Sequence, residues 1–170
     1  LLRSGADANA RSKNGFTPLM FVARSGSIPA AELLLSKGAR INDAANDGAA
    51  PLIIATVRGH VPLATFLLEH GANPNADGNG YTALHWAAGT WSSVTTFDYV
   101  VESGEWSALE GVSGSQKAAL ISALVAHGAN VNALTKRAPP RFGYSLFGQY
   151  HMRGGRFAVG ATPFLIAAWS

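Results

Sequence analysis

Histidines and carboxylates are the side chains of this sequence with the widest choice of chemistry. The histidines do not pair at the i, i+4 spacing of helical metal ligands, and no H-E-x-x-H motif occurs; they are His60, His70, His85, His127 and His151. Glu102, Glu105 and Glu110 could form a carboxylate pair for general acid-base work, but their Ser/Gly-rich surroundings favour a solvated surface. The absence of cysteine excludes thiolate metal sites, disulfides and a cysteine nucleophile. We therefore predict no catalytic residue and no metal site.

Two glycine-rich motifs have the spacing of nucleotide-binding loops. Gly78 to Ala83 reads G-x-G-x-x-A, which binds a dinucleotide only after a strand, whereas the preceding residues 71–77 are turn sequence. Residues 155–162 read G-x-x-x-x-G-x-T, but Ala161 stands where a phosphate-binding loop needs its lysine. Thr162 is better suited to a helix N-cap. We predict no cofactor.

A stretch of interleaved basic and aromatic residues, 136–157, could contact another macromolecule. Such a composition occurs where stacking side chains meet nucleic acid backbones, although its glycines and prolines indicate an irregular loop. The favoured interpretation is an ordered surface loop packed on the rest of the chain. A protein-recognition loop is the second, and contact with nucleic acid or a membrane surface is disfavoured. The possible contact residues are Arg141, Tyr144, Phe147, Tyr150, Arg153 and Arg156.

The composition limits the elements that must position these residues. In 170 residues an apolar share of 48% is enough for a packed core, while 19 glycines and 8 prolines indicate many short elements joined by turns. No apolar run approaches the roughly 20 residues of a membrane span, and no targeting signal is visible, which leaves the compartment unknown. Because the chain begins at Leu1 and not at a methionine, we expect it to be a segment of a longer polypeptide.

Three sequence elements recur in a fixed order. A Gly-Ala pair followed by an asparagine begins at Gly5, Gly38, Gly71 and Gly128, at intervals of 33, 33 and 57 residues. An element similar to Thr-Pro-Leu follows it, at residues 17–19, 50–52, 82–84 and 162–164. A leucine-rich run precedes it, at residues 1–2, 33–35, 66–68 and 123–125. One period shared by three elements indicates an internal repeat.

Each element has a physical reason to sit where it does. Thr17 is suited to an N-cap and Pro18 to the first helical position, so a first helix starts there and ends at Gly26. A second helix is expected over 30–37, and Gly38 suits the left-handed residue that ends it. Such a pair cannot bury both apolar faces alone, so neighbouring pairs must stack. Asparagines at equal offset suit the turn that carries the chain to the next unit: Asn42, Asn75 and Asn132.

The repeat resembles the ankyrin repeat, whose period is near 33 and whose motif is T-P-L-H-x-A. The best copies are residues 15–23, GFTPLMFVA, and residues 80–88, GYTALHWAA; Arg58-Gly59-His60 matches the opening of the family's second helix. The resemblance implies an all-α fold, an ankyrin-type α-solenoid of stacked helix-turn-helix repeats with β-turn fingers and two loop insertions. It also implies that His85, as the motif histidine, hydrogen-bonds between neighbouring turns. It covers roughly residues 1–91, 118–135 and 160–170.

We expect one array over residues 1–170. It divides into a partial repeat 1–13, complete repeats 14–45 and 46–77, a repeat 78–133 with an insertion 92–117, and a partial repeat 134–170 with an extended finger 134–159. In the interrupted repeat the second helix is expected over 118–127. Neither end has the polar cap of a free array, so further repeats are expected in the parent chain.

Charge is distributed unevenly between the two insertions. The formal net charge is +3, yet residues 92–117 carry −3 and residues 118–170 carry +5. An acidic and a basic insertion that leave neighbouring repeats could therefore contact each other. Neutralising Arg141, Arg153 and Arg156 would then change the stability of the chain or the salt dependence of its unfolding.

Ankyrin repeats bind proteins through a concave surface of fingers and first helices, so the resemblance implies a non-catalytic protein-interaction scaffold, not an enzyme. Two alternatives stay open: a regulatory or targeting segment of a larger multidomain enzyme and, less favoured, an enzyme that uses the insertions. The partner is expected to be a protein of unknown identity, with Phe16 and Tyr81 as aromatic anchors. The variable positions predict these contact residues: Arg11, Lys13, Asn14, Phe16, Arg24, Ser25, Asn46, Asp47, Ala49, Val57, Arg58, Asn79, Tyr81 and Thr90.

Overall fold

Short helices alternate with turns along the chain. A computed structural model describes residues 4–78, 80–89, 112–136 and 159–168. Its helices are α1 (Pro18–Ser25), α2 (Ile28–Ser36), α3 (Pro51–Val57), α4 (Val61–Glu69), α5 (Ala83–Ala88), α6 (Gly114–Ala126) and α7 (Pro163–Ala168). Two short strands, β1 (Asp77–Gly78) and β2 (Tyr81–Thr82), lie between α4 and α5.

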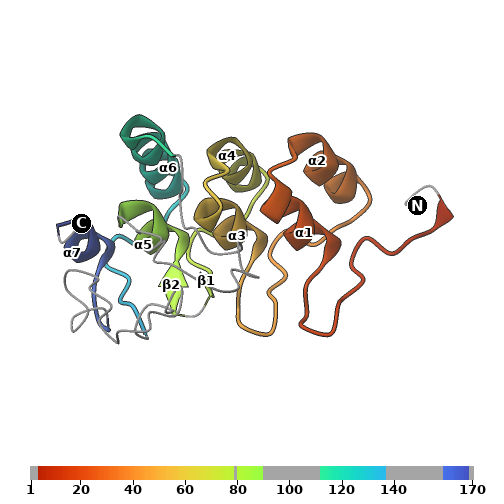
Figure 1. Cartoon of the computed structure of the whole chain (residues 1–170), viewed down its shortest axis with the longest axis horizontal. Coiled ribbons are helices and arrows are strands. Elements are labelled where there is room, and N and C mark those ends of the chain that lie inside the picture. Colours follow the sequence, from red (N-terminus) through yellow and green to blue (C-terminus); the bar gives the residue numbers. More distant parts are fainter. Residues whose placement is uncertain (1–3, 79, 90–111, 137–158, 169–170) are drawn as a thin grey trace, which may run out of the picture.

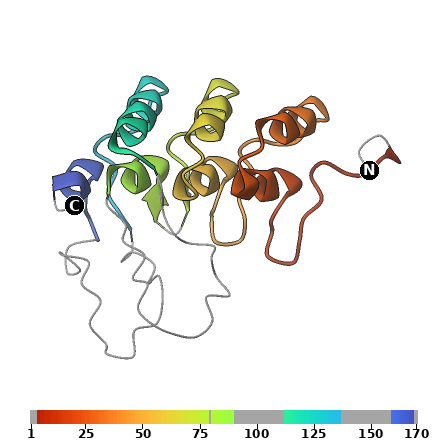
Figure 2. The ribbon, with the colours of Figure 1, turned by 45° about the horizontal axis from the view of Figure 1, so that its top comes forward.

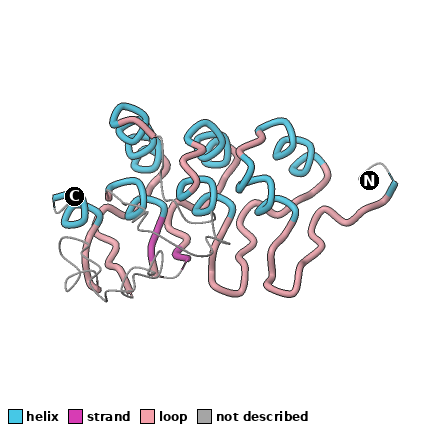
Figure 3. The backbone as a smooth tube through the Cα atoms, viewed as in Figure 1, coloured by secondary structure: helices cyan, strands magenta, loops and turns pink. Residues whose placement is uncertain are grey.

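The helices form two layers. Helices α1, α3, α5 and α7 follow one another in an inner row, and α2, α4 and α6 lie beside it in an outer row (Figures 1 and 2). The connecting loops project from the inner row as fingers, on the side away from the outer row (Figure 3). Because each inner helix contacts the next one, and α2 contacts α4 as α4 contacts α6, the layers are held by stacking, as the repeat predicts.

The first helix pair follows the predicted signals with one correction. Thr17 is the extended N-cap residue of α1, Pro18 is its first residue, and Gly26 closes it with a φ of 76° and an N–H that donates to Val22 O at 3.0 Å. Helix α2 begins at Ile28, two residues before the predicted start. The reason is a cap that the sequence interpretation missed, since Ser27 Oγ accepts a hydrogen bond from the N–H of Ala30.

The second helix of the interrupted repeat also begins earlier than expected. Helix α6 starts at Gly114, so residues 114–117 belong to the helix and not to the insertion. A capping box sets this start: Ser113 Oγ accepts from Gln116 N at 3.3 Å, and Gln116 Oε1 accepts from Ser113 N at 3.0 Å. These reciprocal bonds satisfy backbone donors that the end of a helix leaves unpaired.

The third finger contains the two strands. They pair antiparallel, with Asp77 opposite Thr82 and Gly78 opposite Tyr81. The predicted all-α fold with β-turn fingers is therefore confirmed, and in one finger the two arms also pair as short antiparallel strands. Its backbone also contacts the following finger, because Lys136 N donates to Gly80 O at 3.1 Å and the Lys136 ammonium pairs with Asp77.

Two apolar clusters hold the layers together. The larger one joins the inner and outer rows, and it includes one fully buried leucine from α1, α3 and α4 each: Leu19, Leu52 and Leu67. The smaller one joins α3, α5 and α7 through Ile53, Trp86 and Ile166. Because α7 packs on α5 after a gap of more than seventy positions in the sequence, the stack continues past both predicted insertions.

Asparagine side chains join successive repeats outside the apolar clusters. Asn42 Nδ2 donates to Gly71 O at 3.1 Å, and Asn42 Oδ1 accepts from Asn73 N at 2.7 Å. Asn9 does the same toward the first complete repeat and Asn75 toward the repeat that contains α6. Asn42 and Asn75, which were predicted for a turn, thus also bind the end of the next outer helix. Within the described residues no helix is both long enough and apolar enough to cross a membrane.

Candidate functional site

Among the histidines that the structure describes, one lies in the core, and hydrogen bonds from three segments hold it. His85 Nε2 lies 3.0 Å from Ala133 O and 3.3 Å from Ala161 O, so this nitrogen carries a proton, since carbonyl oxygens only accept. Its Nδ1 accepts from the N–H of Thr82 at 3.1 Å. Burial lowers the pKa of His85, and the two carbonyl bonds partly oppose this shift. The predicted bonding between neighbouring turns is confirmed.

The side chains of two other described histidines also contact the backbone. His60 Nε2 lies 3.0 Å from Arg24 O and His70 Nδ1 lies 2.7 Å from Phe66 O. Among the described residues no group of three or more His, Cys, Asp or Glu could hold a metal ion. His151 and the three glutamates considered as an acid-base pair lie outside the described residues.

The structure brings the predicted finger residues of the two complete repeats together. Asn46 N donates to Asn14 O at 3.1 Å and Asn46 Nδ2 donates to Lys13 O at 3.3 Å, so the two finger tips lie side by side. Six of the predicted residues are exposed, and Phe16, Arg24 and Arg58 are partly buried; the exposed ones are Arg11, Lys13, Asn14, Ser25, Asn46 and Asp47. We call this set of nine residues the finger surface.

A charged network holds the base of the finger surface. Arg11 Nη2 lies 2.9 Å from Asp43 Oδ2, and Arg11 Nη1 donates to Ala44 O at 3.0 Å. Arg40 Nε reaches the same Asp43 oxygen at 3.2 Å. Sequence interpretation did not find Asp43, because no motif marks it and its partner is 32 positions away. Arg11 is thus oriented by the next repeat and still leaves part of its guanidinium accessible.

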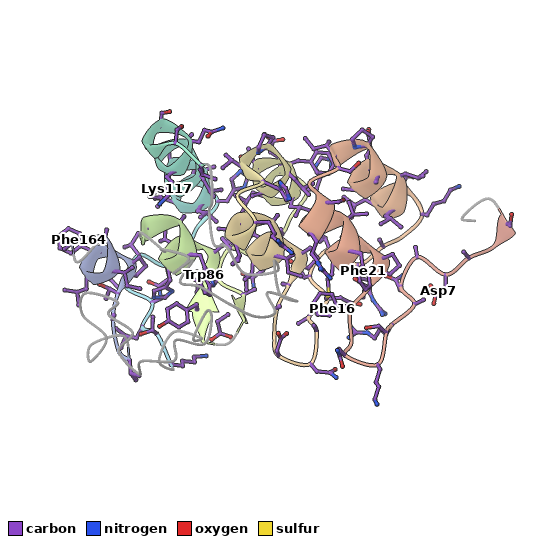
Figure 4. All side chains as sticks on the ribbon, in the orientation of Figure 1. Asp7, Phe16, Phe21, Trp86, Lys117 and Phe164 are labelled. Carbon is purple, nitrogen blue, oxygen red and sulfur yellow. The ribbon has the colours of Figure 1, made fainter. Side chains whose placement is uncertain are left out.

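An aromatic pair lies beside the finger surface. The rings of Phe16 and Phe21 have centroids 5.6 Å apart and tilt by 52°, and both side chains lie at the α1 end of the inner row (Figure 4). Phe21 is 50% exposed, whereas Ile54 and Trp86, its equivalents in the next two repeats, are buried. The sequence interpretation missed Phe21 because repeat equivalence assigns its position to the interior.

Three predicted contact residues are not exposed, which corrects the expectation for them. The exposed fractions are 4% for Ala49, 2% for Val57 and 0% for Tyr81. Tyr81 packs against His85 and Trp86, with ring centroids 5.8 and 5.3 Å away, and burial raises the pKa of its hydroxyl. The prediction that Tyr81 is an exposed anchor is therefore wrong, since its side chain is buried in the apolar cluster that joins α3, α5 and α7.

The remaining predicted contacts cannot be placed on this surface. Asn79 and Thr90 lie outside the described residues, as do the loop positions Arg141, Tyr144, Phe147, Tyr150, Arg153 and Arg156. The hypothesis that the acidic and basic insertions contact each other falls outside them as well.

Hydrogen bonds join the residues that flank each predicted insertion. Lys117 Nζ on α6 donates to Gly89 O, just after α5, at 3.1 Å (Figure 4 labels Lys117). Thr135 N donates to Ala161 O at 2.9 Å, and Gly160 N donates to Thr135 O at 2.8 Å. The side-chain hydroxyl of Thr135 also accepts a hydrogen bond from Ala161 N at 3.0 Å. The repeat scaffold is therefore continuous across both positions.

The two-layer stack, its fingers and its buried motif histidine define a helix-pair solenoid. The family described as Ankyrin repeats (3 copies) matches residues 1–77 and 45–110. This chain belongs to the ankyrin repeat family. Helices α6 and α7 lie beyond the matched range and extend the same stack. Comparison with curated proteins gives no match.

Ankyrin repeats are in general protein-interaction modules. No enzyme domain is identified beside the ankyrin repeats. A protein-binding role therefore follows from the family, while the partner and the contact residues do not.

Proposed function

We propose that this chain binds a partner protein through the finger surface and the Phe16–Phe21 pair, at the α1 end of the concave side. The observation that carries the proposal is the contrast in exposure along the inner row. Lys13, Asn14, Asn46 and Asp47 on the fingers of the two complete repeats are exposed, while Tyr81, at the position equivalent to Phe16, is buried. Partner contacts favour aromatic side chains that are accessible at the centre of a patch.

The charges of the finger surface indicate the chemistry of the partner. The finger surface carries four positively charged side chains, Arg11, Lys13, Arg24 and Arg58, whereas Asp47 is the one predicted contact with a negative charge. An apolar side chain on an acidic segment would complement this arrangement, because opposite charges at the rim steer association and set register. The same surface would serve a free-standing module or a regulatory segment of a larger multidomain enzyme.

Site-specific photocrosslinking tests the proposal. A photoreactive amino acid is placed at Asn14 on the finger tip, and at Ser122 as a matched exposed control on α6 of the outer row. Both proteins are irradiated with the extract of the source cell, and any crosslinked protein is then purified and titrated against the chain. We expect a specific adduct from position 14 and none from position 122. Phe16→Ala should weaken the purified complex about tenfold or more, which is typical of an interface hot spot.

Equal adducts from both positions would contradict the finger surface as the binding site. So would an unchanged affinity of the Phe16→Ala variant for a partner captured at position 14. Circular dichroism of that variant keeps the result interpretable, since a folded variant that has lost affinity reports on contact and not on folding.

A further inference from the structure

A groove on the outer face lies apart from the finger surface. It has a volume of about 310 Å³ and runs between α2 and α4, which neighbour each other in the outer row (Figure 1). Its lining residues are Glu32, Leu35, Ser36, Phe66 and His70. The stacking of repeats does not require these polar side chains, so their arrangement calls for another explanation.

The polar atoms of the groove are available as hydrogen-bond acceptors. His70 Nδ1 lies 2.7 Å from Phe66 O, so Nδ1 carries the proton and Nε2 of the neutral ring accepts. The Ser36 hydroxyl donates to Leu33 O at 2.8 Å, which leaves its lone pairs to accept. The carboxylate of Glu32 only accepts when ionised. A ligand for this groove must therefore supply several donors.

The electrostatics of the groove favour a cation. Among the described residues no hydrogen bond or ion pair engages the Glu32 carboxylate. Helices α2 and α4 both end beside the groove, at Ser36 and Glu69, and the carboxyl end of a helix carries partial negative charge. A positive group in the groove would compensate the charge of the Glu32 carboxylate and the partial negative charge of the two helix ends.

The apolar part of the groove fits a planar group on an aliphatic stem. The rings of Phe66 and His70 have centroids 4.0 Å apart and planes tilted by only 32°, so the two rings stack on each other. Leu35 adds an aliphatic wall. A guanidinium stacks on aromatic faces and presents five donors in a plane, whereas an ammonium is a compact point charge.

The next groove along the outer row lacks this combination. Between α4 and α6, Thr65 takes the place of Glu32 and Ala123 takes the place of Phe66. The acidic side chain and the stacked aromatic pair therefore occur together between α2 and α4, and not between α4 and α6.

We propose that the groove between α2 and α4 binds an arginine side chain of a partner polypeptide. The guanidinium donates to the Glu32 carboxylate, to Ser36 Oγ and to His70 Nε2, while its methylene stem contacts Leu35 and Phe66. This site is on the opposite layer from the finger surface, so its existence does not depend on the proposed function.

Titration of the 170-residue chain with blocked amino acids tests the site. The probes are N-acetyl-arginine amide, N-acetyl-lysine amide and N-acetyl-citrulline amide, and the readout is the set of backbone amide shifts in a proton–nitrogen correlation spectrum. The citrulline probe keeps the shape of arginine without its charge. We expect saturable shifts at Glu32, Ser36 and His70 with the arginine probe, and at least tenfold weaker binding of the other two.

Matched variants separate the groove from the general charge of the surface. Glu32→Gln should weaken the arginine probe at least tenfold, and Phe66→Leu, which installs the residue found at Leu33, should weaken it severalfold. Asp47→Asn removes an exposed carboxylate of the finger surface, away from the groove, and should change binding less than twofold. Absence of saturable shifts, equal binding of the citrulline or lysine probe, or equal effects of the Glu32 and Asp47 variants would overturn the assignment.

Discussion

The imidazole Nε2 of His85 lies 3.0 Å from the carbonyl oxygen of Ala133, 48 residues further along the chain. This bond joins α5 to the next finger, and the bond to Ala161 O joins α5 to the segment before α7. Removing the imidazole should therefore weaken the stacking of these three segments. His85→Met installs the residue type that the equivalent position, Met20, accommodates in the core. We expect the variant to lose about 1–3 kcal/mol at pH 7.5 by chemical denaturation, because the Ala133 carbonyl loses its donor and the Ala161 carbonyl keeps only the one from Thr135 N.

The same residue makes stability depend on pH. Since burial lowers the pKa of His85 in the folded chain, the unfolded chain takes up this proton first as the pH falls. The contribution is present in full above the unfolded pKa of about 6.5 and is lost as the pH falls from there toward the lower folded value. The free energy of unfolding should therefore fall more between pH 7.5 and pH 5.5 in the wild type than in His85→Met. Identical pH profiles would assign this dependence to other groups.

The asparagine contacts can be measured with a control that the chain itself provides. Asn42→Ala removes the donor to Gly71 O and the acceptor for Asn73 N. Asn132 occupies the same repeat position, but no hydrogen bond engages its side chain within the part of the chain that the structure describes. We expect Asn42→Ala to cost about 1–3 kcal/mol and Asn132→Ala to stay within about 0.5 kcal/mol, measured by urea unfolding. Equal losses of stability in the two variants would show that Asn42 acts only within its own turn.

The junction between α1 and α2 should not tolerate a side chain at Gly26. Its φ is 76°, and an added Cβ would lie 2.6 Å from His60 Nδ1, whereas Gly38, with a φ of 81°, has open space around the same position. Both alanine variants carry the left-handed strain of roughly 1–2 kcal/mol, but only Gly26→Ala also displaces the imidazole. Thermal unfolding should therefore give a lower midpoint for Gly26→Ala than for Gly38→Ala. Equal midpoints would mean that His60 moves aside at no cost.

The two aromatic residues predicted as anchors should behave differently. Tyr81 is fully buried, so Tyr81→Ala should cost about 3–5 kcal/mol and lower cooperativity. Phe16 is partly buried, and Phe16→Ala should cost about 1–2 kcal/mol because less apolar area leaves contact. Denaturant titrations of both variants check this difference. A larger loss for Phe16→Ala would place Phe16 in the core and remove it from the finger surface.

Local signals in the sequence predict the helices and their ends well. A threonine before a proline, a glycine that can adopt positive φ and an asparagine at fixed offset each satisfy a requirement of the nearby backbone. For this reason α1 begins at Pro18 and ends before Gly26 as predicted. The starts of α2 and α6 were missed because Ser27 and Ser113 cap them, and a serine is common enough to be overlooked.

Exposure is what only the tertiary structure decided. The sequence by itself determined the repeat and its stacking, since these follow from spacing and from side chains matched to a backbone position, and the resemblance to the ankyrin repeat implied the role of His85. Whether Tyr81 or Phe21 faces solvent depends on segments far away in the chain, because packing partners such as Ile53 and Ala161 bury Tyr81, while Phe21 stays half exposed. The groove between α2 and α4 likewise exists only because stacking sets Glu32 beside Phe66.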